Sequence, residues 1–291
     1  MTFRPDVKLD PGQVRDVRGS RRVRGGGIAL GGGLGTIVII ALILLTGGNL
    51  GDILGGGLGA APAEPGPVSS ELATECATGA DANERQDCRI VGTVNSLDAY
   101  WSEAFQAAGN QYATPGTTLF SEQVTTECGA ASSAVGPFYC PLDQTIYIDL
   151  GFFDDLESRF GAEGGPFAEE YVLAHEYGHH VQNLLGLLEQ GRDAGAEGGA
   201  VRTELQADCF AGVWGANAVA TGFLEPITPE QVDQALNAAS VIGDDRIQEQ
   251  TQGQVNPETW THGSAEQRQQ WFSTGLEQGS ANSCDTFEAD I

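Results

Sequence analysis

Basic residues are scarce in this sequence, and lysine is almost absent. The 291 residues include 14 Lys and Arg against 40 Asp and Glu, and Lys8 is the only lysine. Seven of the basic residues but only three of the acidic ones lie in residues 1–26, which leaves 7 basic against 37 acidic residues in the remainder. The negative electrostatic potential of such a surface repels the phosphates of nucleic acids, so we expect no nucleic-acid partner.

Long apolar runs are absent as well, with one exception. Residues 28–45 contain no charged residue, and ~18 such residues approach the minimum for crossing a bilayer core of ~30 Å. We interpret residues 27–48 as a single transmembrane helix that anchors the protein in the lipid bilayer of the cytoplasmic membrane. The basic residues 1–26 then form a cytoplasmic tail, with the N-terminus inside and the rest of the chain outside. The alternative is a cleaved signal peptide, with residues 60–63 as the cleavage region.

The remainder divides into a linker and one domain. Residues 49–70 are mostly Gly, Ala and Pro, which is typical of a linker. Residues 71–291 are enough for one extracytoplasmic domain with its own core. Apolar spacing and capping residues predict short strands at 118–120 and 144–150, and helices at 91–108, 167–188, 200–221, 228–243 and 264–275. This order predicts an α+β fold with a small sheet, in which residues 144–150 are a candidate edge strand for an extended substrate.

The six cysteines contain no C-x-x-C pair, which favours disulfides over a structural zinc as the alternative. Disulfides also fit a domain outside the membrane. Short loops favour Cys76–Cys88 and Cys128–Cys140, which leaves Cys209 with Cys284.

Histidine is rare, yet two of the four histidines belong to one motif, H-E-x-x-H, at residues 175–179. Positions four apart share one face of a helix, so His175 and His179 can bind the same Zn²⁺. Glu176 can then reach a zinc-bound water and act as the general base of a hydrolase. The adjacent His180 points about 100° away on the helix, which favours a structural role.

A third ligand is predicted on the next helix. Glu204 and Asp208 are also four residues apart, and zinc hydrolases typically use three protein ligands and leave one position for water. We expect Glu204 to bind the metal and Asp208 to hydrogen-bond the far nitrogen of a ligand histidine. An ordinary acidic helix face would give the same spacing.

These motifs resemble those of a bacterial family, the membrane-anchored neutral zinc metallopeptidases with a zincin-like domain. The resemblance runs from about Cys128 to the C-terminus and rests on residues 136–141, 147–150, 174–182, 204–209, 242–245, 261–264, 267–268 and 271–272. It implies a zinc-dependent peptidase that acts on peptides or proteins.

His262 is the remaining candidate catalytic residue. It lies beside Gly263 in a predicted loop, where it could stabilise an oxyanion by a hydrogen bond or be a surface histidine.

Two other functions stay open: a non-catalytic zinc-binding or interaction module outside the membrane, and a zinc hydrolase of non-peptide bonds. The intact Glu176 argues against the first.

Overall fold

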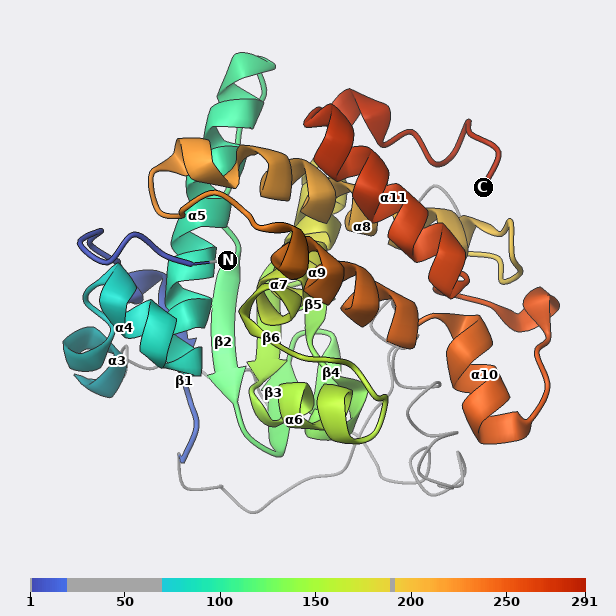
Figure 1. Ribbon diagram of the computed structural model, residues 1–291, viewed down its shortest axis with the longest axis horizontal. Coiled ribbons are helices and arrows are strands. Elements are labelled where there is room, and N and C mark those ends of the chain that lie inside the picture. The colour runs from blue at the N-terminus through green and yellow to red at the C-terminus, as the bar shows by residue number, and fades with distance from the viewer. Residues whose placement is uncertain (1, 20–69, 189–191) are drawn as a thin grey trace.

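The computed structural model describes residues 2–19, 70–188 and 192–291 (Figure 1). Its centre is a four-stranded sheet in the order β1-β2-β6-β5. The strands are β1 (Val14–Asp16), β2 (Gly116–Phe120), β6 (Thr145–Asp149) and β5 (Phe138–Cys140). β1, β2 and β6 are parallel, and β5 runs antiparallel to β6. Together with the helices this gives an α+β fold, as predicted.

The two faces of the sheet bury different clusters because side chains alternate along a strand. Leu119, Ile146 and Ile148 join the main helical core. Phe120 and Tyr147 point the other way and pack with Phe138, Val135 and Cys140. The second cluster lies under the hairpin of β3 (Gln123–Thr126) and β4 (Gly129–Ser132), whose Val124 and Ala131 contact it. Both faces of the sheet are therefore covered.

Helices make up most of the described chain. They are α3 (Ser70–Glu75), α4 (Gly79–Glu84), α5 (Gln86–Ala107), α6 (Gly151–Ser158), α7 (Pro166–Leu185), α8 (Gly199–Asn217), α9 (Pro229–Val241), α10 (Asp244–Gln252) and α11 (Ala265–Gln278). The five predicted helices correspond to α5, α7, α8, α9 and α11, of which α5 begins five residues earlier than predicted, whereas α3, α4, α6 and α10 were not predicted. Short 3-10 helices lie at Pro11–Gln13, Ser133–Val135, Ala218–Thr221, Pro257–Thr259 and Ala281–Ser283. Capping boxes begin α9 at Thr228 and α11 at Ser264, as the sequence predicts.

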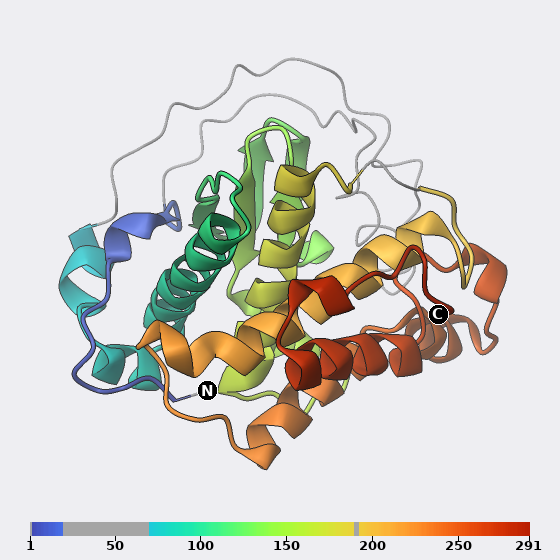
Figure 2. The ribbon, with the colours of Figure 1, turned by 90° about the horizontal axis from the view of Figure 1, so that it is seen from above.

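α8 and α11 pack side by side, as Figures 1 and 2 both show. Their backbones approach so closely that a Cβ on Gly275 would lie 2.0 Å from the carbonyl oxygen of Cys209. Only glycine fits there. This contact brings the last helix of the chain against the helix that carries Glu204 and Asp208.

Three disulfides connect the cysteines in the pairs that loop length favours. Cys76 bonds Cys88, Cys128 bonds Cys140 and Cys209 bonds Cys284. The last of these ties the C-terminal segment to α8.

The predicted edge strand is wrong. Residues 144–150 contain β6, which is paired on both sides, with β2 and with β5. The terminal strand on this side is β5, a three-residue strand that also contacts α7. A strand this short has too little apolar alternation to be recognised from sequence alone.

The predicted single-pass membrane arrangement is also wrong. Residues 2–19, predicted as part of a cytoplasmic tail, belong to the same folded unit as residues 70–291: β1 pairs with β2. Phe3 is fully buried, its backbone exchanges hydrogen bonds with Asn83, and its ring lies over Gly92 of α5. A single crossing between them would put these two parts on opposite sides of a membrane.

No helix within the described ranges is long and apolar enough to cross a membrane. The transmembrane helix predicted at 27–48, the rest of the tail and most of the linker at 49–70 lie outside the described residues. The misleading signal was charge. Arginines before an apolar run are typical of a cytoplasmic flank, but Arg18 instead forms ion pairs with Asp16 and with Asp87 of α5.

Candidate metal centre

Two helices carry the candidate metal ligands. α7 begins with Pro166 in its first turn and ends at Gly186, which has the left-handed conformation typical of a helix C-terminus. It carries His175, Glu176 and His179, and α8 carries Glu204 and Asp208. At Gly178 the two helices meet so closely that a Cβ would lie 2.8 Å from the Cα of Ala207. This approach brings the side chains of both helices together.

The three predicted ligands converge. One ligand atom from each of His175, His179 and Glu204 lies within 4.8 Å of the others. His175 Nε2 is 3.1 Å from Glu204 Oε2, and His179 Nε2 is 3.6 Å from Glu204 Oε1. Two imidazoles and one carboxylate form the ligand set of many zinc hydrolases. The residues therefore fit a zinc ion.

Hydrogen bonds at the far ring nitrogens orient both histidines. His175 Nδ1 lies 2.8 Å from Asp208 Oδ1, and His179 Nδ1 lies 2.9 Å from Gln182 Oε1. The amide of Gln182 is itself fixed, because its nitrogen donates to the carbonyl oxygen of Thr203 at 2.7 Å. With Nδ1 as the donor in each ring, Nε2 keeps its lone pair for a metal.

Asp208 is held in turn by buried partners. Arg268 of α11 donates from Nε to Asp208 Oδ2 at 2.8 Å and from a terminal nitrogen to Oδ1 at 2.9 Å. The hydroxyl of Tyr171 donates to Asp208 Oδ1 at 2.5 Å. Asp208 is fully buried and Arg268 is 2% exposed. The carboxylate is therefore satisfied on both oxygens and locked in place.

A cavity opens beside these residues, and both candidate catalytic residues line it. Glu176, His175 and Glu204 form part of its wall, and His262 reaches it from the loop before α11. Asp244 positions His262: its carboxylate accepts from the His262 backbone N–H at 2.6 Å and lies 3.2 Å from Nδ1. The predicted pair Glu176 and His262 thus shares one cavity with two of the candidate ligands, His175 and Glu204.

Burial and charge shift the pKa values of the site. Burial raises the pKa of Glu176, against the opposing effect of His179 and His175. Burial alone would lower the pKa of His175, but Asp208 and Glu204 outweigh it and raise the value to about 10. Burial also opposes the ionisation of Glu204, yet His179 and His175 hold its pKa well below the usual range. A buried carboxyl with a raised pKa is suited to accept and return a proton.

His180 has the structural role expected of it. Both ring nitrogens are engaged, Nδ1 with the Tyr139 hydroxyl at 3.0 Å and Nε2 with the Ala113 carbonyl oxygen at 2.6 Å. The ring is fully buried. It has no nitrogen left for a metal.

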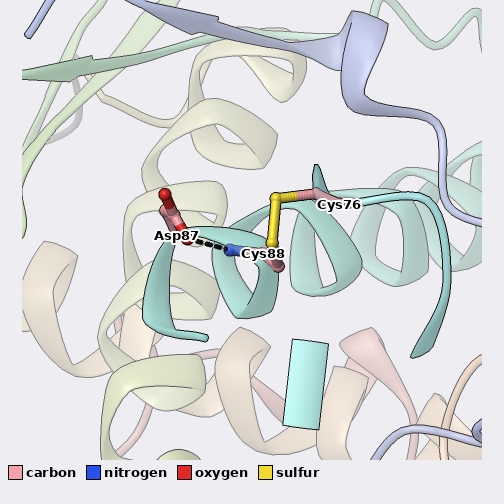
Figure 3. A group of neighbouring side chains, drawn as sticks. All are labelled: Cys76, Asp87 and Cys88. Carbon is pink, nitrogen blue, oxygen red and sulfur yellow. Dashed lines mark hydrogen bonds between the residues drawn. A yellow bond between two sulfur atoms is a disulfide. The ribbon is translucent and has the colours of Figure 1, made fainter. Parts of the chain in front are cut away.

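A second group of ligand-type residues among those described is Cys76, Asp87 and Cys88. Figure 3 shows why it does not resemble a metal site: the two sulfurs are bonded to each other. Asp87 accepts hydrogen bonds from Arg18 and Arg85 and from the backbone N–H of Cys88. Its ligand atoms are already used.

No role was given to Gln182, Asp244, Arg268 or Tyr171 in the sequence analysis. For Gln182 a signal existed, because position 182 is one helical turn from His179 and faces the same way. Asp244 and Arg268 lie within segments that carry the family resemblance, but helical spacing gives them no role. They lie on other elements, and only the fold brings them to His262 and Asp208.

The comparisons with known proteins agree with this geometry. A family described as "Putative neutral zinc metallopeptidase" matches residues 4–287, and the chain belongs to this family. It is 56% identical to "Uncharacterized protein Mb2605" of Mycobacterium bovis over 225 residues, 74% of this chain and 75% of that protein. It is 38% identical to "Uncharacterized protein YpfJ" of Escherichia coli K12 over 285 residues, 95% of each chain. No solved structure matches the chain.

Proposed function

We propose that this protein is a zinc-dependent peptidase. The observation that carries the proposal is the convergence of His175, His179 and Glu204 within 4.8 Å, with Glu176 beside them in the wall of a cavity. The family description points to the same chemistry. In this proposal residues 71–291 supply the ligands and the catalytic groups, and the substrate is a peptide or protein.

Zinc, when bound by these three residues, supplies a Lewis acid that polarises a carbonyl group and lowers the pKa of water toward ~7. Glu176 is not needed as a ligand and has a raised pKa. It therefore accepts a proton from the attacking water and returns it to the leaving amine. Asp208 and Gln182 keep the two imidazoles in the tautomer that leaves Nε2 free.

His262 stabilises the negative charge that develops on the carbonyl oxygen. Asp244 accepts from the His262 backbone N–H, and its carboxylate and the Thr261 hydroxyl both face Nδ1, which orients the ring. In the proposed role Nε2 carries a proton and is the donor to the oxyanion. The strand β5 ends the sheet beside α7, and an extended peptide can pair with it.

The test is peptide hydrolysis by the purified, zinc-loaded protein, with Glu176→Gln as the matched control. The variant should keep its zinc and lose about 10²- to 10⁴-fold in turnover, the usual contribution of general acid–base catalysis. Elemental analysis measures the metal and a casein or peptide digest measures turnover. Equal rates for the two proteins would overturn the role of Glu176. No cleavage of any peptide by the zinc-loaded wild type would favour a non-catalytic zinc-binding module.

A further inference from the structure

The cavity at the metal centre extends away from the ligands into an apolar chamber. Its apolar lining comes from α6, the segment after it, α7, the turn between α9 and α10, and α10: Phe152, Phe160, Val172, Ile242 and Ile247. We infer that this chamber binds one medium-sized aliphatic side chain of the substrate, at a residue next to the scissile bond. The inference rests on the proposed function and names the substrate class of that same site.

Four of the wall residues belong to the main hydrophobic core but keep a small exposed surface, as several other core residues do. Leu173 and Tyr177, which lie on α7 near Val172, have no exposed surface, whereas Val172 and Ile247 keep 6% and Phe152 and Phe160 keep 7%. All four line the chamber. Part of the apolar surface of these side chains borders the cavity that Glu176 also lines. A substrate side chain would cover that surface, which is favourable by the hydrophobic effect.

The chamber offers no partner for a charged side chain. Its only cationic lining residue besides the histidines is Arg268, which is already paired with both oxygens of Asp208. Its carboxylates are Glu176 and Glu204, which the proposed chemistry uses. Burying an unpaired charge is costly. The chamber therefore selects against Lys, Arg, Asp and Glu, even though the protein as a whole is strongly acidic.

The size of the chamber limits which apolar side chains of the substrate can fit. The whole cavity, including the space beside the candidate ligands, has a volume of about 70 Å³, so the chamber is no larger than that. An engineered apolar cavity of about 150 Å³ is large enough for benzene, so this chamber fits a branched aliphatic group better than an aromatic ring. We expect leucine, isoleucine and valine to be preferred, and tryptophan to be rejected.

The first experiment is a digest of a randomised peptide library by the zinc-loaded full-length protein, with mass spectrometry to identify the cleaved bonds. Leucine, isoleucine or valine should be enriched on one side of the cleaved bond. For a matched peptide pair, leucine at that position should give about 10- to 100-fold higher kcat/KM than alanine, from the surface that its side chain buries. Cleavage without such enrichment, or with a preference for basic residues, would overturn the inference and leave the proposed function intact.

Variants of Ile247 test the chamber itself, since this residue lies outside the ligand helices. Ile247→Ala enlarges the chamber and should raise the ratio of kcat/KM for phenylalanine over leucine by about 5- to 10-fold. Ile247→Trp fills the chamber and should reduce the advantage of leucine over alanine by about ten-fold or more. Leu142→Ala is the control, because Leu142 is 68% exposed and does not line the chamber. Unchanged preferences in both Ile247 variants, with thermal unfolding showing that they fold, would overturn the inference.

A binding measurement separates this inference from the proposed function. Calorimetric titration of Glu176→Gln should show tighter binding of the leucine peptide than of a matched aspartate peptide, whether or not the wild type cleaves either. If the wild type cleaves neither peptide but the binding preference holds, the inference about the chamber is supported and the peptidase proposal fails. Equal binding of the two peptides would overturn the inference that the chamber prefers an aliphatic side chain.

Discussion

Arg268 and Asp208 form a two-point ion pair across the contact between α11 and α8, with N–O distances of 2.8 and 2.9 Å. Asp208 in turn lies 2.8 Å from His175 Nδ1. The last helix of the protein thus reaches the candidate metal ligand through one carboxylate. Arg268 also holds the pKa of Asp208 down at about 2, against the opposing effect of burial. Asp208 is therefore ionised at any pH at which the protein would act, and it can orient His175 throughout.

Breaking this pair should destabilise the fold. Arg268→Met leaves Asp208 buried without its counter-charge, and such a loss typically costs about 3–5 kcal/mol in the free energy of unfolding. Arg268→Lys keeps the charge but not the two-point geometry, so it should cost less. Denaturant unfolding measures both. Arg246→Met is the matched control, because Arg246 is exposed on α10. Equal stability of Arg268→Met and Arg246→Met would contradict the role given to the pair.

Zinc should bind once per chain, through His175, His179 and Glu204. Replacing His179 or Glu204 by alanine should lower the zinc affinity by about ten-fold or more, since a catalytic site has only three protein ligands. Elemental analysis after dialysis gives the stoichiometry, and competition with a chelator gives the affinity. The site would be rejected if His179→Ala still carried one tightly bound zinc.

Gln182 is expected to act on zinc only through His179. Gln182→Met removes the acceptor at Nδ1 while keeping a side chain of similar length, and the zinc affinity should fall by roughly 10- to 100-fold. Gln182→Glu keeps an acceptor and should bind zinc more tightly than the Met variant. The comparison of these two variants in the same chelator competition isolates the hydrogen bond from the packing. If both variants bind zinc as the wild type does, Gln182 does not orient His179.

His262 should contribute to turnover and not to zinc binding. His262→Ala is expected to keep its zinc and to lose about 10²- to 10³-fold in kcat with little change in KM, as expected for a donor to a developing oxyanion. Asp244→Asn weakens the interactions that orient the His262 ring and should lower kcat by a smaller factor. Steady-state kinetics on one peptide checks both. A large rise in KM at unchanged kcat would instead assign His262 to substrate binding.

Asp98 should make stability depend on pH. This carboxyl is 6% exposed, and burial raises its pKa to about 7 although Tyr112 donates a hydrogen bond to it at 2.8 Å. A raised pKa means that the folded protein favours the protonated form of Asp98. The contribution of this residue to the free energy of unfolding is therefore complete below about pH 4 and is lost as the pH rises toward 7. Asp98→Asn should therefore be more stable than the wild type above pH 7, by roughly 2–4 kcal/mol.

The difference between Asp98→Asn and the wild type should shrink as the pH falls toward 4. Denaturant unfolding at a series of pH values measures it, and Glu103→Gln, an exposed position on the same helix, is the control. A constant difference across the range would mean that the carboxyl does not titrate as described.

The sequence alone determined the features that depend on local spacing. Positions four apart share a helix face, so the H-E-x-x-H and E-x-x-x-D motifs place His175, His179, Glu204 and Asp208 correctly on two helices. The capping boxes at Thr228 and Ser264 are equally local. Two of the disulfides close loops of 12 residues, and the third then follows because only two cysteines remain.

The tertiary structure decided everything that joins distant segments. Arg268 meets Asp208 because α11 packs on α8, and Asp244 meets His262 because the N-terminus of α10 lies against the loop before α11. Residues 14–16 become a strand because β2 offers an unpaired edge and the domain buries Phe3. Charge and hydropathy describe each segment by itself, whereas pairing and packing depend on which surfaces the rest of the chain leaves uncovered. That is why Arg18, one of the basic residues that predicted a cytoplasmic tail, instead pairs with Asp16 and with Asp87 of α5.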